Sequence, residues 1–259
     1  MAVAKYFATI GEITMPHLGI ETLLLINATA LVAATLAAVT GFGGAAVLLP
    51  VLVMAFGVRD AIPILTVAQL IGNGSRVWFN RRELDYRVVG WFALGGVPLA
   101  ALGGLLFAHA PLTALTRLLG VFLLLIVAWR RLRPQTYFRP PLRSFAFIGA
   151  GASFLSALLG SVGPLMAPFF LAYGLVKGAY IGTEALSTVV MHVTKLIAYR
   201  DAAILPERSI LIGLAMGPIM FLGSWLGKRI VDRLPKRVFV ILIEATMTVA
   251  GLLFLIRGR

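Results

Sequence analysis

The stretch TGFGGAAVLLP, Thr40–Pro50, places three glycines and a proline inside a long run without charged residues. A second stretch, LLGSVGPLMAP, Leu158–Pro168, has the same arrangement of a glycine-containing break followed by a proline. Glycine readily leaves the helical conformation, and proline removes a helical hydrogen bond. The two stretches therefore predict two apolar helical regions that are interrupted in the same way.

The runs around these breaks are typical of membrane-spanning helices. The 259 residues are 60% hydrophobic and 13% charged, and the mean hydropathy is +0.96. A soluble domain carries about 25% charged residues. Residues 22–58, 88–116 and 144–176 contain no Asp, Glu, Lys or Arg, and about 20 apolar residues are enough to cross a bilayer. The sequence thus predicts an all-α, polytopic helical membrane protein.

Composition also argues against several function classes. The net charge of +13 would suggest a nucleic-acid partner in a soluble protein, but loop Lys and Arg residues orient membrane proteins, so we expect no nucleic acid. The chain has no cysteine, which excludes disulfides and thiolate chemistry. It also has no Walker loop, HExxH motif or metal-ligand cluster. We expect no metal, cofactor or enzymatic activity, and Glu12 and Pro16 interrupt what could be a signal peptide.

Hydrophobic runs and helix breakers predict about ten helical segments in one transmembrane domain, residues 1–259. The segments lie near 20–39, 44–57, 61–80, 88–108, 112–130, 144–159, 163–176, 179–199, 209–229 and 238–256. Two of them have only about 14 residues, and at 1.5 Å per residue they would be shorter than a hydrocarbon core of about 30 Å. We expect these two to be re-entrant half-helices or steeply packed interior helices.

The two halves of the chain resemble each other. The basic linker RRLRPQTYFRPPLR, 130–143, separates internal repeat 1 at about 20–130 from internal repeat 2 at about 144–257. An offset of 119 residues relates Gly41 to Gly160, and the same offset relates Arg76 to Lys195 and Asn73 to His192. Five segments per repeat would insert the repeats from opposite sides, which is the inverted-repeat architecture of secondary transporters.

Basic residues predict the orientation in the membrane. If ten crossings alternate, one side receives 14 Lys and Arg residues, and the other receives 7. The richer side, including the loop 130–143, should be cytoplasmic, with both termini on the opposite face of the cell (inner or plasma) membrane.

Polar residues on two segments are candidates for a binding site, because polar groups in the hydrocarbon core are costly and usually functional. Gln69, Asn73 and Arg76 recur at helical spacing on the third segment. On the eighth, Thr188 and Lys195 share a face with Glu184. The predicted anion site comprises Gln69, Asn73, Arg76, Ser187, Thr188, His192, Lys195, Gly41, Gly43, Gly44, Gly160 and Gly163.

Each candidate has a simpler alternative. Arg76 and Lys195 could extend to the membrane surface, and the glycines could serve helix packing only. Where a glycine break begins a short helix, however, free N–H groups and the positive end of the helix dipole favour an anion. Glu184 could carry a coupling proton, pair with Lys195 or His192, or be a structural residue near the membrane surface.

Four stretches of the chain match a known family in their order: GFGGAAVLLPVLVMAFGVRDAI, NRRELDYRVVGWFALGGVPLAALGG, LLGSVGPLMAPFFLAYGLVKGAYIGTEAL and GPIMFLGSWLGKRIVDRLPKR. By these stretches the chain resembles, from about residue 22 to 256, the sulfite exporter TauE/SafE family, also called the toluene sulfonate uptake permease family. The second break, GSVGP, departs from a more glycine-rich family pattern. The resemblance implies transport of sulfite, thiosulfate, sulfoacetate or taurine-related anions.

The sequence therefore predicts a secondary transporter that works by alternating access and carries a small anion, with sulfite or another sulfur oxyanion or organosulfonate as the expected substrate. Its expected partners are the anion, the lipid bilayer, H⁺ as a possible coupling ion and a second copy in a possible homodimer. The alternative is a non-transporting membrane scaffold or assembly factor for a partner complex.

Overall fold

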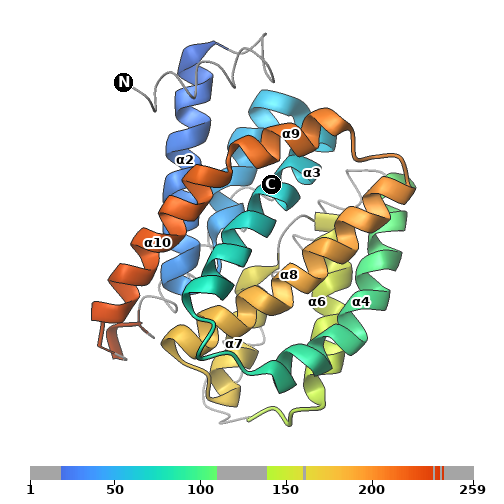
Figure 1. Ribbon diagram of the computed structural model, residues 1–259. Helices are drawn as coiled ribbons and strands as arrows, with labels where there is room; N and C mark the ends of the chain where they lie inside the picture. The colour runs from blue at the N-terminus through green and yellow to red at the C-terminus, as the bar shows by residue number, and fades with distance from the viewer. Residues whose placement is uncertain (1–18, 110–138, 160–161, 236, 240, 242–259) are drawn as a thin grey trace, which may run out of the picture.

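The computed structural model describes residues 19–109, 139–159, 162–235, 237–239 and 241, and the regular structure in these residues is helical (Figure 1). The helices are α2 Ile20–Thr40, α3 Gly44–Phe79, α4 Tyr86–His109, α6 Ser144–Leu159, α7 Gly163–Tyr173, α8 Lys177–Asp201, α9 Glu207–Ala215 and α10 Gly217–Arg233. The predicted all-α fold is confirmed. The predicted segment 112–130, and nearly all of 238–256, lie outside the described residues.

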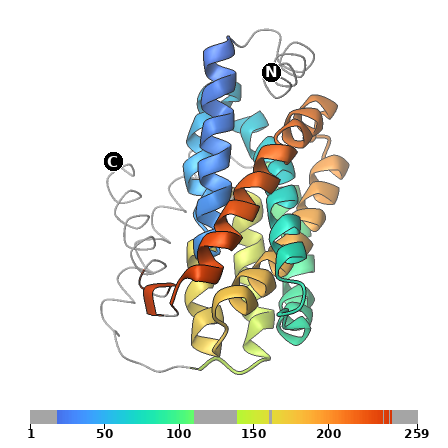
Figure 2. The same cartoon turned by 60° about the vertical axis from the view of Figure 1, so that its left-hand side comes forward.

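Several described helices have the length and composition of membrane spans. Ile20–Thr40 and Tyr86–Phe107 each qualify alone, and α9 with α10 qualifies as one span that is bent by 41°. Figure 2 shows α2, drawn in blue, standing upright in the upper part of the molecule. Large apolar side chains such as Met54 and Phe147 are 85% and 82% exposed, as expected for a surface that faces lipid rather than water.

One segment differs from the sequence-based expectation. The predicted segment 209–229 is two helices, because Pro218 in the first turn of α10 cannot donate a hydrogen bond back to α9. The predicted division between 44–57 and 61–80 is present inside α3, because Gly57 leaves the helical conformation, with φ of 75° and ψ of 163°.

The two short helical stretches have equivalent bounds. One begins at Gly44 and ends at the Gly57 kink, and the other, α7, begins at Gly163 and ends before Gly174. Both terminal glycines have positive φ, 75° and 109°, a conformation that glycine adopts without steric cost. The predicted short segments are thus present, each between a glycine start and a glycine stop.

In each half of the chain, one helix packs mainly on helices of the other half. Helix α4 packs on α6 and α8, whereas α10 packs on α2 and α3. Glycines allow the close approach: a Cβ at Gly103 of α4 would lie 2.8 Å from the Phe154 carbonyl oxygen, and a Cβ at Gly223 of α10 would lie 2.8 Å from the Leu31 carbonyl oxygen. These matched contacts agree with an internal repeat, and the inverted relation of the two halves stays a prediction.

Basic segments gather at one end of the helix bundle. The Lys228 ammonium lies 3.7 Å from a Glu83 carboxylate oxygen, and the Lys177 ammonium donates to the Asp232 carbonyl at 3.4 Å. Figure 1 shows the loop between α3 and α4, the start of α6 and the turn between α7 and α8 together at this end. The start of α2 and the loop between α8 and α9 lie at the other end.

Candidate functional site

The first glycine break is a tight, left-handed turn between α2 and α3. Gly41 and Gly43 have φ of 84° and 92°. The Thr40 hydroxyl donates to the Phe42 carbonyl at 2.7 Å and accepts from the Phe42 N–H at 3.4 Å. These bonds hold the turn open after α2 ends, so that α3 begins at Gly44 with no side chain capping its N-terminus.

The two breaks contact each other. A Cβ at Gly163, the first residue of α7, would lie 2.6 Å from the Phe42 Cβ. A Cβ at Gly41 would overlap the Tyr180 ring, and the Tyr180 hydroxyl donates to the Thr40 carbonyl at 3.1 Å. Glycine is required at these positions because each break is packed tightly against residues of the other half.

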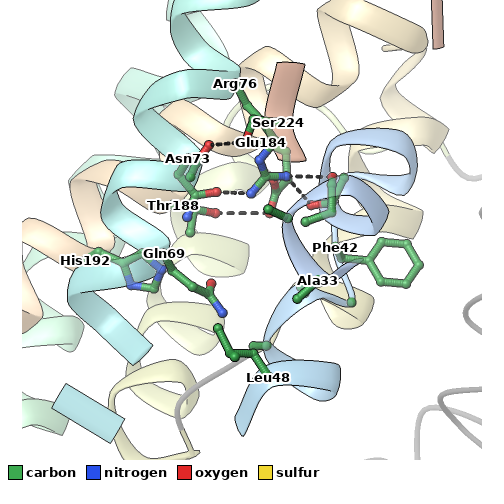
Figure 3. Close-up of a pocket in the computed structure, with 18 of the residues that line it drawn as sticks. Ala33, Phe42, Leu48, Gln69, Asn73, Arg76, Glu184, Thr188, His192 and Ser224 are labelled. Atoms are coloured by element: carbon green, nitrogen blue, oxygen red, sulfur yellow. Dashed lines mark hydrogen bonds and ion pairs between the residues drawn. The ribbon is translucent and has the colours of Figure 1, made fainter. Parts of the chain in front are cut away.

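A cavity of about 40 Å³ lies where the breaks meet (Figure 3). Its wall contains the Gly41–Gly44 turn, Val162 and Gly163 at the start of α7, and small residues of α2 such as Ala33 and Ala37. The start of α7, like that of α3, has no side-chain cap. Two helix N-termini without side-chain caps therefore border one small cavity, although at the start of α7 Pro164 has no N–H group and the N–H groups of Leu165 and Met166 donate to the Val162 carbonyl.

Arg76 is buried beside this cavity and satisfies the end of α2. One guanidinium nitrogen donates to the carbonyl oxygens of Ala37 at 3.0 Å and Gly41 at 2.9 Å. The same nitrogen lies 3.5 Å from a Glu184 carboxylate oxygen, and the other donates to the Asn73 side-chain oxygen. Arg76 thus neutralises Glu184 and also donates to the carbonyls at the C-terminus of α2, where the Ala37 carbonyl accepts a second hydrogen bond beside that from the Gly41 N–H.

Glu184 is held from two sides. The Thr188 hydroxyl donates to one carboxylate oxygen at 3.0 Å, while the other oxygen faces Arg76. Figure 3 shows these side chains grouped on one side of the cavity, with Gln69, His192 and Leu48 below them. Glu184 is 2% exposed and lines the cavity.

Two buried polar side chains of the cavity wall have unused hydrogen-bonding groups. Among the described residues, the Asn73 side-chain nitrogen and both ring nitrogens of His192 have no hydrogen-bond partner. Both residues are 1% exposed. A buried donor without a partner costs about 1–3 kcal/mol, so a ligand in the cavity that accepts hydrogen bonds would remove an existing penalty.

Lys195 stands behind the cavity wall rather than in it. It is 0% exposed, and its ammonium donates to the Ser156 hydroxyl of α6 at 3.3 Å. Ser156 itself lines the cavity, and no carboxylate of the described residues pairs with Lys195. The contact Lys195–Ser156 and the contact Arg76–Ala37 both join residues 39 positions apart, so the two cations reach equivalent turns of α6 and α2.

The cavity brings together most residues of the predicted site. The lining includes Gly41, Gly43, Gly44, Gly163, Gln69, Asn73, Arg76, Thr188, His192 and Glu184. Ser187 does not line it and donates to the Thr183 carbonyl at 2.9 Å. Gly160 lies outside the described residues.

Two of the alternatives are contradicted. Arg76 and Lys195 do not extend to the membrane surface, because they are 5% and 0% exposed. The partner of Glu184 is Arg76 and not Lys195 or His192.

Sequence reasoning missed several residues of the site. Thr40 and Tyr180 shape the first break, and Ser156 and Ser224 line the cavity. Ser156 could have been found, since it lies 119 positions after Ala37 in the repeat. The others carry no signal in the sequence.

Comparison with known proteins agrees with this architecture. The family model described as Sulfite exporter TauE/SafE matches residues 26–254. No curated protein and no solved structure matches the chain. Because the family model covers most of the sequence, the chain belongs to the sulfite exporter TauE/SafE family, a family of integral membrane transporters for sulfur-containing anions and not of enzymes.

Proposed function

We propose that the cavity between the two glycine breaks binds a small sulfur oxyanion or organosulfonate, with sulfite as the first choice, and that the protein carries this anion across the plasma membrane. The observation that carries the proposal is the set of unpartnered groups on Asn73 and His192, which border the same cavity as two uncapped helix N-termini. Such N-termini favour anions.

The charges around the cavity support an anionic ligand. Counted in their ordinary ionised states, Arg76 and Lys195 contribute two positive charges, and Glu184 contributes one negative charge. With His192 counted as neutral, the buried cluster has a formal charge of +1. An uncompensated charge away from water costs several kcal/mol, so an anion would stabilise this cluster by completing its charge balance.

The size of the cavity favours a compact ligand. A volume of about 40 Å³ holds up to about three water molecules, since one water needs about 10–15 Å³. Anions of four or five non-hydrogen atoms, such as sulfite, thiosulfate and methanesulfonate, suit this space. Longer sulfonates such as sulfoacetate would require the cavity to widen.

Movement of the two halves against each other would give the anion alternating access. Two observations support an inverted repeat around the cavity. Helices α4 and α10 each pack on helices of the other half, and the two glycine breaks have equivalent bounds. In this arrangement the bound anion stays near the repeat interface while the access path changes sides. We assign the basic end of the bundle to the cytoplasm, because loops rich in Lys and Arg stay there.

Binding can be tested by the thermal stability of the detergent-purified protein in the presence of single anions. We expect sulfite, thiosulfate or methanesulfonate to raise the melting temperature, and equal concentrations of chloride or phosphate to raise it less. Asn73→Asp keeps the oxygen that accepts from Arg76 but replaces the unpartnered donor by a negative charge, so this variant should lose the stabilisation.

Asn27→Asp is the matched control, because Asn27 of α2 donates to the Leu23 carbonyl at 2.8 Å and does not line the cavity. It should respond to anions like the unchanged protein. Equal stabilisation of Asn73→Asp and Asn27→Asp would refute the proposed site.

A further inference from the structure

Glu184 raises a question that anion binding alone leaves open. A site for an anion contains a carboxylate that lines the same cavity, 3.5 Å from the guanidinium of Arg76 and 3.0 Å from the Thr188 hydroxyl. A second anion in this small space would be repelled by an ionised Glu184. A carboxylate can avoid that repulsion by taking up a proton.

We propose that Glu184 is a proton-binding site that adjusts the charge of the cavity to that of its ligand: one proton is taken up with each divalent anion, and none with a monovalent anion. The inference rests on the proposed function. It makes the protein a proton-coupled carrier for divalent sulfur anions and an uncoupled carrier for monovalent ones.

The charge balance of the buried cluster leads to this rule. The cluster of Arg76, Lys195 and ionised Glu184 has a formal charge of +1, so a monovalent anion brings the sum to zero. A divalent anion brings the sum to −1, and protonation of Glu184 returns it to zero. Because unbalanced charge in a buried site is costly, the neutral combination should be preferred in both cases.

The surroundings single out Glu184 as the group that takes the proton. Arg76 faces it from α3, and Tyr180 lies one turn before it on α8, whereas His192 and Lys195 lie about two and three turns after it on the same helix. The lining residues of α2, α6, α7 and α10, namely Ala33, Ala34, Ala37, Ser156, Gly163, Met166, Met220 and Ser224, carry no charge. Arg76 and Lys195 supply the positive charges in this count. Protonation of His192 would remove its free ring nitrogen as a hydrogen-bond acceptor, and it would leave Glu184 ionised and repelled by the anion.

The step is a simple proton transfer. A proton from the solution that enters the cavity with the anion adds to the Glu184 oxygen that faces Arg76. The Arg76 guanidinium, freed from the carboxylate, can then donate to the anion, and the other Glu184 oxygen still accepts from Thr188. Release of the anion on the far side lets the ion pair form again and returns the proton to solution.

Thiosulfate and methanesulfonate form a matched pair of probes. Each has five non-hydrogen atoms in a tetrahedral arrangement, but thiosulfate is divalent and methanesulfonate is monovalent across the neutral pH range. Calorimetric titration of the purified protein in buffers with different ionisation enthalpies measures the protons taken up per anion bound. We expect about one proton for thiosulfate and about none for methanesulfonate.

The pH dependence should follow the same rule. Since the thiosulfate complex binds one more proton than the free protein, its affinity should rise by up to about tenfold for each unit that the pH falls. Methanesulfonate affinity should not change over this range. This measurement needs no variant and decides the proposal even if substitution of Glu184 prevents folding.

Glu184→Gln keeps the size of the side chain and removes the proton site. In this variant we expect thiosulfate to bind without proton uptake and with an increased preference over methanesulfonate, because the buried charge becomes +2. His192→Asn should weaken binding of both anions and keep the proton uptake with thiosulfate.

Three results would overturn the proposal: binding of thiosulfate without proton uptake, equal proton uptake for both anions, or uptake that persists in Glu184→Gln. The last would assign the proton to Lys195 or His192. A protein that binds neither anion would instead refute the proposed function, so the two failures are distinguishable.

Discussion

At the scale of single residues, Arg76 both holds the end of α2 and pairs with Glu184 beside the cavity. The spacing of Gln69, Asn73 and Arg76 allowed their common face to be predicted, because i, i+4 and i+7 positions follow from helix geometry. The ion pair with Glu184 could not be predicted, since it joins residues 108 positions apart. Only the packing of α3 on α8 brings the two charges together.

This role predicts the effect of removing the positive charge. Arg76→Met removes the partner of the Glu184 carboxylate and the side-chain donor to the Gly41 carbonyl, and it leaves the Ala37 carbonyl with the Gly41 N–H alone. Breaking a buried ion pair costs about 3–5 kcal/mol. We expect that loss in the free energy of unfolding, measured by SDS titration of the protein in mixed micelles.

The double variant Arg76→Met/Glu184→Met separates the charge effect from the lost hydrogen bonds. It should recover much of the stability, because an apolar pair of similar volume replaces a buried ion pair at little cost. Arg82→Met, at an exposed position, is the control and should change stability little. A double variant less stable than Arg76→Met would contradict the importance of the pair.

At the scale of helices, close packing between α4 and α6 sets the position of one wall of the site. Gly149 of α6 lies against the backbone of Phe92, where an added Cβ would overlap the carbonyl group. Gly151, two residues on, has no neighbour within 4 Å of an added Cβ and faces the outside. The two glycines therefore serve as a matched pair on one helix.

We expect Gly149→Ala to lower the free energy of unfolding by about 1–3 kcal/mol, because the helices must separate to admit the methyl group. Gly151→Ala should leave stability unchanged or raise it by up to about 1 kcal/mol, since alanine favours the helix. SDS titration of both variants measures the difference. Equal stability of the two would show that α4 and α6 do not pack as described.

Helix existence was more predictable than helix continuity. Hydrophobic runs located both short stretches, and the glycines at their starts marked where each break occurs. The division of 209–229 into α9 and α10, with a bend of 41°, depends on tertiary packing that decides whether a breaker ends a helix or bends it. The sequence pattern contains the breakers but not that outcome.

At the scale of the whole molecule, orientation follows from the basic end of the bundle. The chain has no cysteine, so single cysteines report position without a background. Arg143→Cys lies in the segment before α6, and Glu207→Cys lies at the start of α9; both native residues are exposed. In right-side-out vesicles, a membrane-impermeant maleimide should label Glu207→Cys and spare Arg143→Cys. The reverse pattern would contradict the assigned orientation.

The internal repeat stays a prediction, which rests on glycines, prolines and buried cations that recur in order along the sequence. The packing of the two glycine breaks against each other, which forms the cavity, could not be predicted from the sequence. Contacts such as that of Phe42 with Gly163 form only when the two halves of the chain are packed together. The sequence pattern identified most of the polar residues and glycines proposed to bind the anion, and the fold places most of them around one cavity.

We propose above that the protein binds a small sulfur anion in this cavity and carries it across the membrane. The most direct test is uptake of radiolabelled sulfite into proteoliposomes that contain the purified protein and a sulfite gradient. We predict uptake well above that of empty liposomes, abolished by Asn73→Asp and retained by Asn27→Asp. Uptake equal to that of empty liposomes, or undiminished in Asn73→Asp, would contradict the account.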